Sequence, residues 1–330
     1  MAKILILGAG SMGTAFSFPC SDNNHEVIIV GTHLENEFID KINSMKKHPI
    51  LNCDIPKNVS FFKIEKLKEV INKKVDLIAV AVISKGIEWA SLELSKVLKN
   101  NIPILILTKG LSIKNNNYEV LAHKMDRILK KNGIKETNIT GAGGPCLAKG
   151  LANRNHTYVV FANNKIEIAR QIKKIVSTDY YHVSTTDDVI GVEVCAAIKN
   201  IFSMAIGSAK NLNTAAGLIQ QSIKEMIIFT EKLKGKKETV IGLAGVADLY
   251  VSADGGRNSK MGEYLGDGMT FKEAKKNKMP NDTVEGADLA IEIGSKVRND
   301  FNIDTLPLMI SVINSICDEK KLKIDWNSFN

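Results

Sequence analysis

The chain has few cysteines, and none of them stand at a spacing typical of disulfide frameworks or metal sites. Its five cysteines are odd in number, far apart and never in a CxxC string: Cys20, Cys53, Cys146, Cys195 and Cys317. A disulfide scaffold or a Cys-based zinc site needs paired or closely spaced cysteines. We therefore expect reduced thiols in a cytoplasmic protein, and no bound metal.

Long apolar runs and dense patches of one charge are also missing. Only four apolar residues, Ile4–Leu7, follow the first three, so we expect neither a signal peptide nor membrane insertion. The net charge of +8 comes from scattered lysines, and the densest cluster, at 232–237, lies between Glu231 and Glu238 without interleaved aromatic residues. This pattern argues against nucleic-acid binding. A positive balance instead suits an enzyme of anionic substrates.

The chain does show a change of pattern near the polar stretch Ser184–Asp187. Before it, short Val-, Ile- and Leu-rich runs alternate with segments of helical periodicity. The expected strands are Ile4–Leu7, Val27–Val30, Leu77–Val82, Ile102–Leu107, Asn138–Thr140 and Tyr158–Phe161, and the expected helices are Thr14–Ser21, Glu35–Met45, Lys85–Leu98 and Tyr118–Lys131. Strands alternating with helices predict a doubly wound parallel sheet of the Rossmann type.

Beyond the polar stretch, helical periodicity dominates. The expected helices are Val189–Ala209, Leu218–Leu233, Val284–Asp300 and Leu306–Asp318. We therefore predict an α/β chain with two domains: a dinucleotide-binding domain over residues 1–185 and a mostly α-helical, substrate-binding domain over residues 186–330.

The clearest motif is a glycine fingerprint, Gly8-Ala9-Gly10-Ser11-Met12-Gly13, directly after the first strand and before a helix. Gly8 permits the tight turn, Gly10 lets backbone amides approach a pyrophosphate, and Gly13 lets the helix pack closely on the strand. The helix N-terminus then offers N–H groups and a positive dipole end to the phosphate. This context predicts NAD or NADP binding.

The end of the second strand leaves the choice between the two cofactors open. NAD enzymes usually carry an acidic residue there, whereas this chain has Val30-Gly31-Thr32-His33, with neither a carboxylate nor an arginine. Thr32 or His33 could hydrogen-bond either a 2′-hydroxyl or a 2′-phosphate. We therefore expect NADP to be at least tolerated.

Three places have the residues expected of a chemical site. Lys109, in Thr108-Lys109-Gly110, follows a strand and points toward the sheet's carboxyl edge, where ligands of such sheets bind. The glycine-rich turn at Gly143–Ala148 could bind an anion through backbone amides. Lys199 stands at the end of the nearly all-apolar helical stretch Val192–Ile198, where a lysine must be paired or functional. A buried lysine beside another cation can exchange a proton near neutral pH.

Together these segments resemble the bacterial NAD(P)-dependent glycerol-3-phosphate dehydrogenases. The resemblance covers nearly the whole chain. Its specific part is the later motifs, which occur in the family's order: Thr108-Lys109-Gly110, Gly144-Pro145, Glu193, Ala197-Ile198-Lys199-Asn200, Leu243–Leu249, Gly256-Arg257-Asn258 and Val284-Glu285-Gly286.

The resemblance implies a role for each matching residue. Lys199 would exchange the proton with the carbonyl oxygen, Lys109 would act beside it, and Asp248 would anchor Lys199. The cofactor would contact Gly8, Gly10, Ser11, Met12, Gly13, His33, Lys109, Ala148, Arg257 and Glu285. The substrate would contact Lys109, Gly144, Cys146, Lys199, Asp248, Gly256, Arg257 and Asn258, with Arg257 and Asn258 on its phosphate.

The chain also departs from the family's pattern. Cys146 stands where the family has Ser or Thr, Leu147 where it has an aromatic residue, and Gly150 where it has Glu. Ala247 replaces a glycine, and Gly256 replaces a serine. The changes at Cys146 and Gly256 remove two hydroxyls near the expected substrate pocket, where backbone amides can still bind the substrate.

The resulting hypothesis is reversible reduction of dihydroxyacetone phosphate to sn-glycerol 3-phosphate, which supplies phospholipid synthesis. Hydride would reach the carbonyl carbon from the nicotinamide while Lys199 protonates the alkoxide and Lys109 stabilises negative charge. The first alternative is a β-hydroxyacid or ketopantoate-type reductase, and the second is a non-catalytic dinucleotide sensor. Arg257 and Asn258 favour a phosphorylated substrate over a carboxylate. Whether the chain forms a homodimer stays open.

Overall fold

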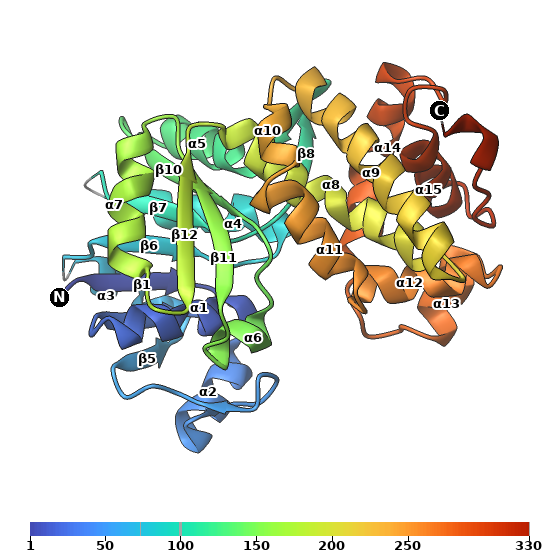
Figure 1. The fold of residues 1–330 in the computed structure, drawn as a ribbon. Coiled ribbons are helices and arrows are strands. Elements are labelled where there is room, and N and C mark those ends of the chain that lie inside the picture. Colours follow the sequence, from blue (N-terminus) through green and yellow to red (C-terminus); the bar gives the residue numbers. More distant parts are fainter. Residues whose placement is uncertain (73, 99–100, 330) are drawn as a thin grey trace. The chain divides into compact units, whose positions relative to one another are not determined.

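The computed structural model describes residues 1–72, 74–98 and 101–329. Contacts divide the chain into two compact units (Figure 1). Unit 1 comprises Met1–Lys109 and Leu121–Val189, and unit 2 comprises Gly110–Val120 and Ile190–Asn330. The short segment Gly110–Val120 therefore packs with the helical unit, although it lies within the stretch 1–185 that was predicted as one domain.

Unit 1 is built on an eight-stranded sheet of order β12-β11-β10-β7-β6-β1-β2-β5. Neighbouring strands are parallel except for the antiparallel pair β10 and β11. The strands are β1 (Lys3–Leu7), β2 (Glu26–Val30), β5 (Val59–Phe62), β6 (Leu77–Val80), β7 (Pro103–Ile106), β10 (Asn138–Gly143), β11 (Thr157–Ala162) and β12 (Tyr181–Thr186). The predicted Rossmann-type sheet is confirmed.

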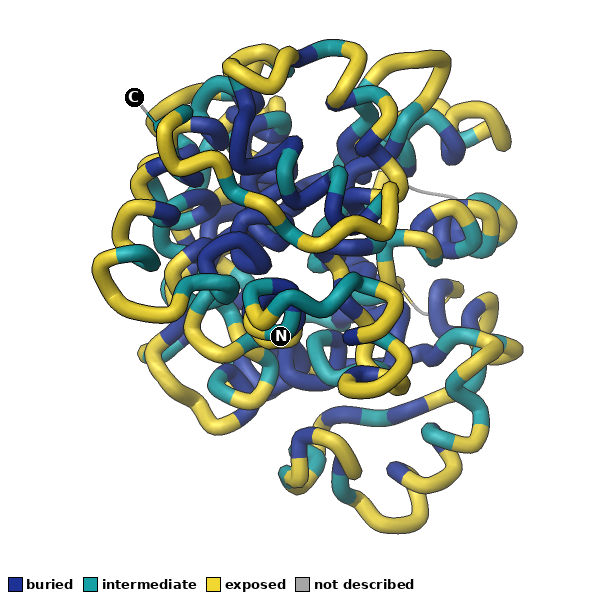
Figure 2. The backbone as a smooth tube through the Cα atoms, turned by 90° about the vertical axis from the view of Figure 1, so that its right-hand side faces the viewer, coloured by how far each residue is buried: buried dark blue, intermediate teal, exposed yellow. Residues whose placement is uncertain are grey.

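Helices cover both faces of this sheet because both faces of its central strands are apolar. Alternate residues such as Ile4 and Ile6 pack with Phe16 of α1, and the intervening Leu5 and Leu7 are equally buried. The helices of unit 1 are α1 (Ser11–Asp22), α2 (Asn36–Met45), α3 (Leu67–Ile71), α4 (Ile87–Ser95), α5 (Leu121–Lys131), α6 (Ala148–Ala152) and α7 (Ile166–Val176). A small hairpin, β3 (Lys47–His48) with β4 (Cys53–Asp54), follows α2. Figure 2 shows how buried, intermediate and exposed stretches alternate along the backbone.

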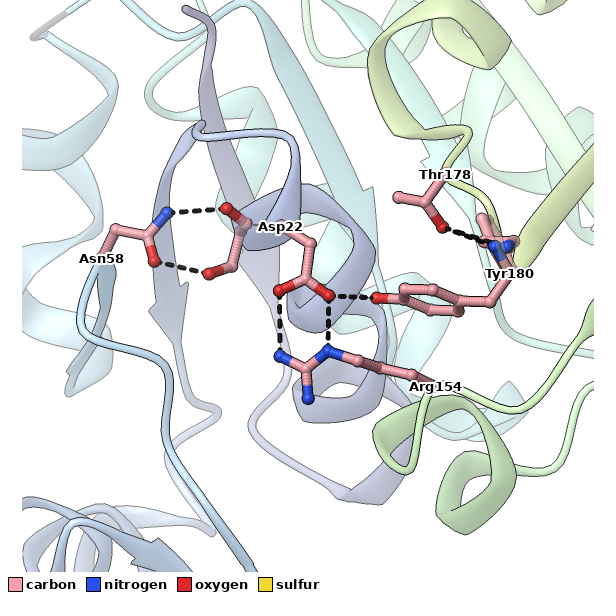
Figure 3. Close-up of polar contacts among 7 residues, drawn as sticks. Asp22, Asn58, Arg154, Thr178 and Tyr180 are labelled. Carbon is pink, nitrogen blue, oxygen red and sulfur yellow. Dashed lines mark hydrogen bonds and ion pairs between the residues drawn. The ribbon is translucent and has the colours of Figure 1, made fainter.

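A charged network fixes the far end of α1, the helix that the glycine fingerprint opens (Figure 3). The carboxylate of Asp22 accepts hydrogen bonds from Arg154 Nε at 2.7 Å, Arg154 Nη2 at 2.9 Å and the Tyr180 hydroxyl at 2.6 Å. Partial burial raises the pKa of Asp22. The hydrogen bonds from Arg154 and Tyr180 together lower it by more, so the pKa lies below its usual range. The network ties α1 to the segments after α6 and before β12.

Unit 2 is mostly helical and also contains the hairpin formed by β8 (Leu111–Lys114) and β9 (Asn117–Val120). Its helices are α8 (Val189–Gly207), α9 (Leu212–Lys232), α10 (Lys237–Val240), a π-helical turn at Leu243–Ala247, α11 (Asp248–Ala253), α12 (Arg257–Gly266), α13 (Phe271–Asn277), α14 (Glu285–Asp300) and α15 (Pro307–Cys317). The mostly helical second part is thus confirmed. The sequence had predicted helix from Tyr118 onward, but residues 117–120 form strand β9, because their backbone pairs in antiparallel register with that of β8.

Helix α8 is the buried centre of unit 2. By length and composition it is the one helix of the described ranges that could cross a membrane, and 94% of its apolar window is buried inside the protein. The core helix of a folded domain can be equally long and apolar, so this composition is weak evidence for a membrane span. Two glycines bring neighbouring helices against it: a Cβ on Gly262 of α12 would lie 2.0 Å from Met204 O, and one on Gly286 of α14 would lie 2.3 Å from Asn200 O.

A buried carboxylate joins α9 to α15. Glu225 accepts hydrogen bonds from the backbone N–H groups of Leu308 and Met309, both at 2.8 Å, and from Gln221 Nε2 at 2.8 Å. It thereby caps the first turn of α15, where N–H groups have no partner within the helix. Burial raises the pKa of Glu225 to about 7, which outweighs the lowering by these hydrogen bonds.

Candidate functional site

The glycine fingerprint forms a tight loop between β1 and α1. Gly8 has φ +114°, and a Cβ there would lie 2.8 Å from Ala81 O. A Cβ on Gly13 would lie 2.2 Å from Gly8 O, so both positions require glycine. Gly10 differs, because the nearest atom to its ideal Cβ is Glu35 Oε1, 3.8 Å away. The space above Gly10 is therefore open, and the N-terminus of the 12-residue helix α1 faces it.

This loop fits the pyrophosphate of a dinucleotide. Ser11 and Met12 begin α1, and Gly10 at its N-cap leaves the first turn without a side-chain cap. The N–H groups of that turn can therefore bind phosphate oxygens, helped by the helix dipole. Nicotinamide cofactors of doubly wound sheets bind at this edge.

The ribose end of the loop contains a residue that the sequence analysis missed. No carboxylate occurs at positions 30–33, but Glu35 reaches back, and its Oε2 accepts hydrogen bonds from Thr32 N at 2.7 Å and Ala9 N at 3.2 Å. The statement that positions 30–33 carry no carboxylate holds, and the carboxylate comes from Glu35, two residues further along the chain. His33, predicted to touch the cofactor, lies with its ring 5.3 Å from the ring of Trp89.

Lys109 and the turn after β10 lie together at the carboxyl edge of the sheet. Lys109 Nζ donates a hydrogen bond to Gly144 O at 3.1 Å. Gly144 has φ +111°, and a Cβ there would press on the β11 backbone at 3.0 Å. Cys146 is half-buried, and Ala148 begins α6. The structure thus brings the predicted residues Lys109 and Gly144 into contact because β7 and β10 are parallel neighbours.

The second cluster surrounds Lys199 on α8. The lysine is 5% exposed, and its Nζ lies 2.5 Å from Asp248 Oδ1 and 2.5 Å from Ser252 Oγ. Asp248 is 2% exposed and begins α11, so Ser252 lies one turn later on the same helix. Two of the ammonium's donor directions are thereby fixed. Ser252 was missed because no local signal separates it from other serines.

A third cluster joins the starts of α12 and α14 to α8. Asn258 Nδ2 donates to Asn200 Oδ1 at 3.1 Å, and Asn258 Oδ1 accepts from Gly286 N at 2.9 Å. Arg257 Nη2 donates to Glu285 Oε1 at 2.5 Å, an ion pair with both side chains about half exposed. One guanidinium nitrogen is thereby used, and the planar group has five N–H donors in total.

The departures from the family pattern have modest local effects. Gly256 is the N-cap of α12 and provides no side-chain cap, which costs only a few tenths of a kcal/mol relative to serine. Gly150 lies in α6, where a Cβ would meet nothing nearer than Asn155 Nδ2 at 3.8 Å. Leu147 is 63% exposed, and Ala247 ends the π-helical turn before Asp248. Nothing in the structure explains the absence of a carboxylate at Gly150.

Two family models match the chain in succession. The model for the NAD-dependent glycerol-3-phosphate dehydrogenase N-terminus matches residues 3–169, and that for the C-terminus matches residues 188–325. This chain belongs to that family. The resemblance stated from the motifs is therefore confirmed, as are the dehydrogenase class and NAD or NADP as the cofactor class.

Relatives of this family member align over nearly their whole length. An NADP(+)-dependent glycerol-3-phosphate dehydrogenase of Archaeoglobus fulgidus is 33% identical over 91% of this chain and 92% of its own. A glycerol-3-phosphate dehydrogenase [NAD(P)+] of Fusobacterium nucleatum is 31% identical over 97% and 94%. Among solved structures, glycerol-3-phosphate dehydrogenase of Coxiella burnetii has a TM-score of 0.84 at 24% identity, covering 99% of this chain and 97% of its own.

The fold is also shared with enzymes of the first alternative. A 2-dehydropantoate 2-reductase structure from Enterococcus faecalis, described as putative, has a TM-score of 0.51 at 14% identity, over 96% of this chain and 97% of its own. Likeness at this level concerns the fold alone. The family models decide between the two dehydrogenase classes, whereas the roles assigned to single residues stay predictions.

Proposed function

We propose that this dehydrogenase interconverts dihydroxyacetone phosphate and sn-glycerol 3-phosphate with a nicotinamide cofactor. The observation that carries the proposal is the buried Lys199–Asp248 pair, with 2.5 Å between Nζ and Oδ1. A charged pair in an apolar helix core costs desolvation energy, so its retention needs a reason beyond stability. Proton exchange with a carbonyl oxygen provides that reason.

The chain's own residues perform the acid–base part of the reaction. When bound, the cofactor supplies the hydride for the carbonyl carbon. Lys199 donates a proton to the oxygen of that carbonyl in reduction, and its neutral amine accepts the proton in oxidation. Asp248 and Ser252 hold Nζ in one direction, which removes the need to order the lysine during the reaction. Asp248 also stabilises the protonated form between turnovers.

Two further cations, Arg257 and Lys109, interact with the negative charge of the substrate. Arg257 binds the phosphate through the N–H groups that do not donate to Glu285, because a planar guanidinium matches phosphate oxygens. Asn258 is held by Asn200 and by the N–H of Gly286, so it adds an oriented amide beside Arg257. Lys109, positioned by Gly144 O, stabilises negative charge on the substrate.

The proposed reaction also suggests a compartment and a use for its product. We propose that the reaction takes place in the cytoplasm and supplies the glycerol phosphate from which phospholipids are built. The five cysteines, none in a disulfide, support a reducing compartment. The phosphorylated substrate is a small molecule, and the proposal involves neither nucleic acid nor membrane insertion.

One assay panel tests the proposed reaction. Purified protein is given NADH or NADPH together with dihydroxyacetone phosphate, unphosphorylated dihydroxyacetone, ketopantoate or a short β-keto acid, and nicotinamide oxidation is followed by absorbance at the reduced-nicotinamide band. The proposal predicts a kcat/KM for dihydroxyacetone phosphate at least about a hundredfold above every other substrate, since a bound phosphate dianion contributes several charge-assisted hydrogen bonds. Preference for ketopantoate or a β-keto acid would overturn it.

A further inference from the structure

The carboxylate of Glu35 is placed in an unusual way for its position in the chain. Glu35 is the N-cap of α2, where an acidic side chain normally accepts a hydrogen bond from its own helix, yet it forms no such bond. Its Oε2 instead accepts from Thr32 N at 2.7 Å and from Ala9 N at 3.2 Å. The side chain therefore links the end of β2 to the glycine loop.

Local packing makes this reach possible. Gly31 follows β2 directly, and a Cβ there would lie 2.3 Å from Ile39 Cδ1 and 3.4 Å from Glu35 Cβ. The absence of a side chain at Gly31 lets the first turn of α2 pack against the end of the strand without displacing Ile39. The second carboxylate oxygen, Oε1, is the atom nearest to the open space above Gly10. One oxygen is thus fixed by two backbone amides, and the other faces the cofactor side of the loop.

We propose that Glu35 binds the adenosine ribose hydroxyls and makes this dehydrogenase selective for NAD over NADP. In doubly wound sheets the adenosine ribose lies between the glycine loop and the end of the second strand, where a carboxylate accepts hydrogen bonds from its hydroxyls. A 2′-phosphate in that place would set up to two negative charges against an ionised carboxylate. The selectivity goes beyond family membership, since the family includes an enzyme named as NADP(+)-dependent.

Positive charge beside Glu35 would weaken the repulsion between its carboxylate and a 2′-phosphate. Within residues 1–72, 74–98 and 101–329, no cationic side chain forms an ion pair with Glu35. The nearest titratable ring of the β3–β4 hairpin, His48, is fully buried, and burial lowers its pKa although the Ala9 backbone and Glu35 act in the opposite direction. His48 is therefore uncharged at neutral pH and adds no positive charge that would attract a 2′-phosphate.

Direct binding measures this selectivity without any turnover. The protein's affinity for NADH and NADPH is determined by titration of nicotinamide fluorescence, in the absence of substrate. We expect NADH to bind at least about tenfold more tightly, because one like-charge contact of a few ångström corresponds to a factor of ten or more in a partly screened site. Equal or tighter binding of NADPH would refute the proposal. Since no substrate is present, this result is independent of the proposed reaction.

A conservative variant distinguishes two roles of Glu35: repelling a 2′-phosphate by its charge, and supporting the glycine loop by its hydrogen bonds. In Glu35→Gln the amide oxygen can still accept from Ala9 N and Thr32 N, so the loop keeps its support, but the negative charge is gone. The ratio of the NADPH to the NADH dissociation constants should then fall about tenfold, chiefly through tighter NADPH binding. Glu37→Gln, an exposed acidic residue in the first turn of the same helix, is the matched control and should leave the ratio unchanged. An unchanged ratio in Glu35→Gln would mean that Glu35 acts only as a loop anchor and would overturn the proposal.

Discussion

The mechanism depends most on Lys199, and its replacement by methionine tests it. Methionine keeps most of the bulk and the flexible stem but removes the ammonium. Because general acid–base catalysis typically contributes 10²–10⁴-fold, kcat should fall on the order of a thousandfold. Cofactor affinity should barely change, since Lys199 is not part of the glycine loop that is proposed to bind the pyrophosphate. Stopped-flow or steady-state nicotinamide oxidation with dihydroxyacetone phosphate measures the first quantity, and fluorescence titration measures the second.

The buried ion pair makes stability part of the same prediction. Removing Lys199 leaves the carboxylate of Asp248, 2% exposed, without its ammonium partner. Breaking a buried pair in this way costs about 3–5 kcal/mol. For a domain of this size that corresponds to a loss of roughly 6–20 °C in Tm, at about 2–4 °C per kcal/mol. The double variant Lys199→Met/Asp248→Asn removes both charges and should recover much of that Tm, while its kcat stays as low.

A matched control distinguishes catalysis from general damage to unit 2. Lys296 on α14 is also a partly buried lysine, paired with Asp300 at 2.8 Å, and Lys296→Met should reduce Tm slightly with kcat unchanged. Lys199→Arg should be nearly as inactive as Lys199→Met, because a guanidinium does not release its proton near neutral pH. A folded double variant with kcat within tenfold of the unaltered enzyme would refute the role of Lys199, and Lys109 would then be the next candidate.

Three further predictions address the cofactor, the phosphate and the fold. Gly10→Val should abolish dinucleotide binding while the chain still folds, because nothing lies within 3.8 Å of its Cβ position; unchanged fluorescence titration of the folded variant would remove the glycine loop from the cofactor site. Arg257→Ala should raise KM for dihydroxyacetone phosphate by orders of magnitude and affect unphosphorylated dihydroxyacetone much less; equal losses would place Arg257 on the cofactor or the fold. The pKa of Glu225 is raised in the folded state from 4.5 to about 7, so its stabilising contribution is fully present below pH 4.5 and is lost as the pH rises through 7. The Tm of Glu225→Gln should therefore improve relative to the unaltered protein between pH 5 and pH 8, and a constant difference would contradict the shifted pKa.

Sequence patterns predicted much of the architecture because they record local constraints. Apolar runs such as Ile4–Leu7 are buried on both faces, which only a covered parallel sheet provides. The fingerprint glycines could be assigned because a Cβ on Gly8 or Gly13 would collide with backbone, whereas Gly10 leaves open the space through which a phosphate approaches. The hairpin at 111–120 was missed for the converse reason. Its strands of four residues each carry too little periodicity to be distinguished from the following helix.

The residues of the site also differ in whether a local sequence pattern could identify them. Lys199 could be selected from the sequence because a lysine in an apolar helix is costly unless it has a partner, and Asp248, 49 positions later, came only from the family resemblance. Ser252 and Glu35 carry no local signal, since serines and glutamates are common at helix surfaces. Their roles depend on the hydrogen-bond partners that the folded chain places beside them.

By itself, then, the sequence determined the sheet, the cofactor loop, the helical second part and the family, because backbone sterics and hydrophobic periodicity act over a few neighbouring residues. Only the tertiary structure decided that the Glu35 carboxylate turns from its own helix to Ala9 and Thr32, and that Ser252 joins Asp248 at Lys199. Flexible side chains choose hydrogen-bond partners by distance in space, and those distances exist only after strands and helices have packed.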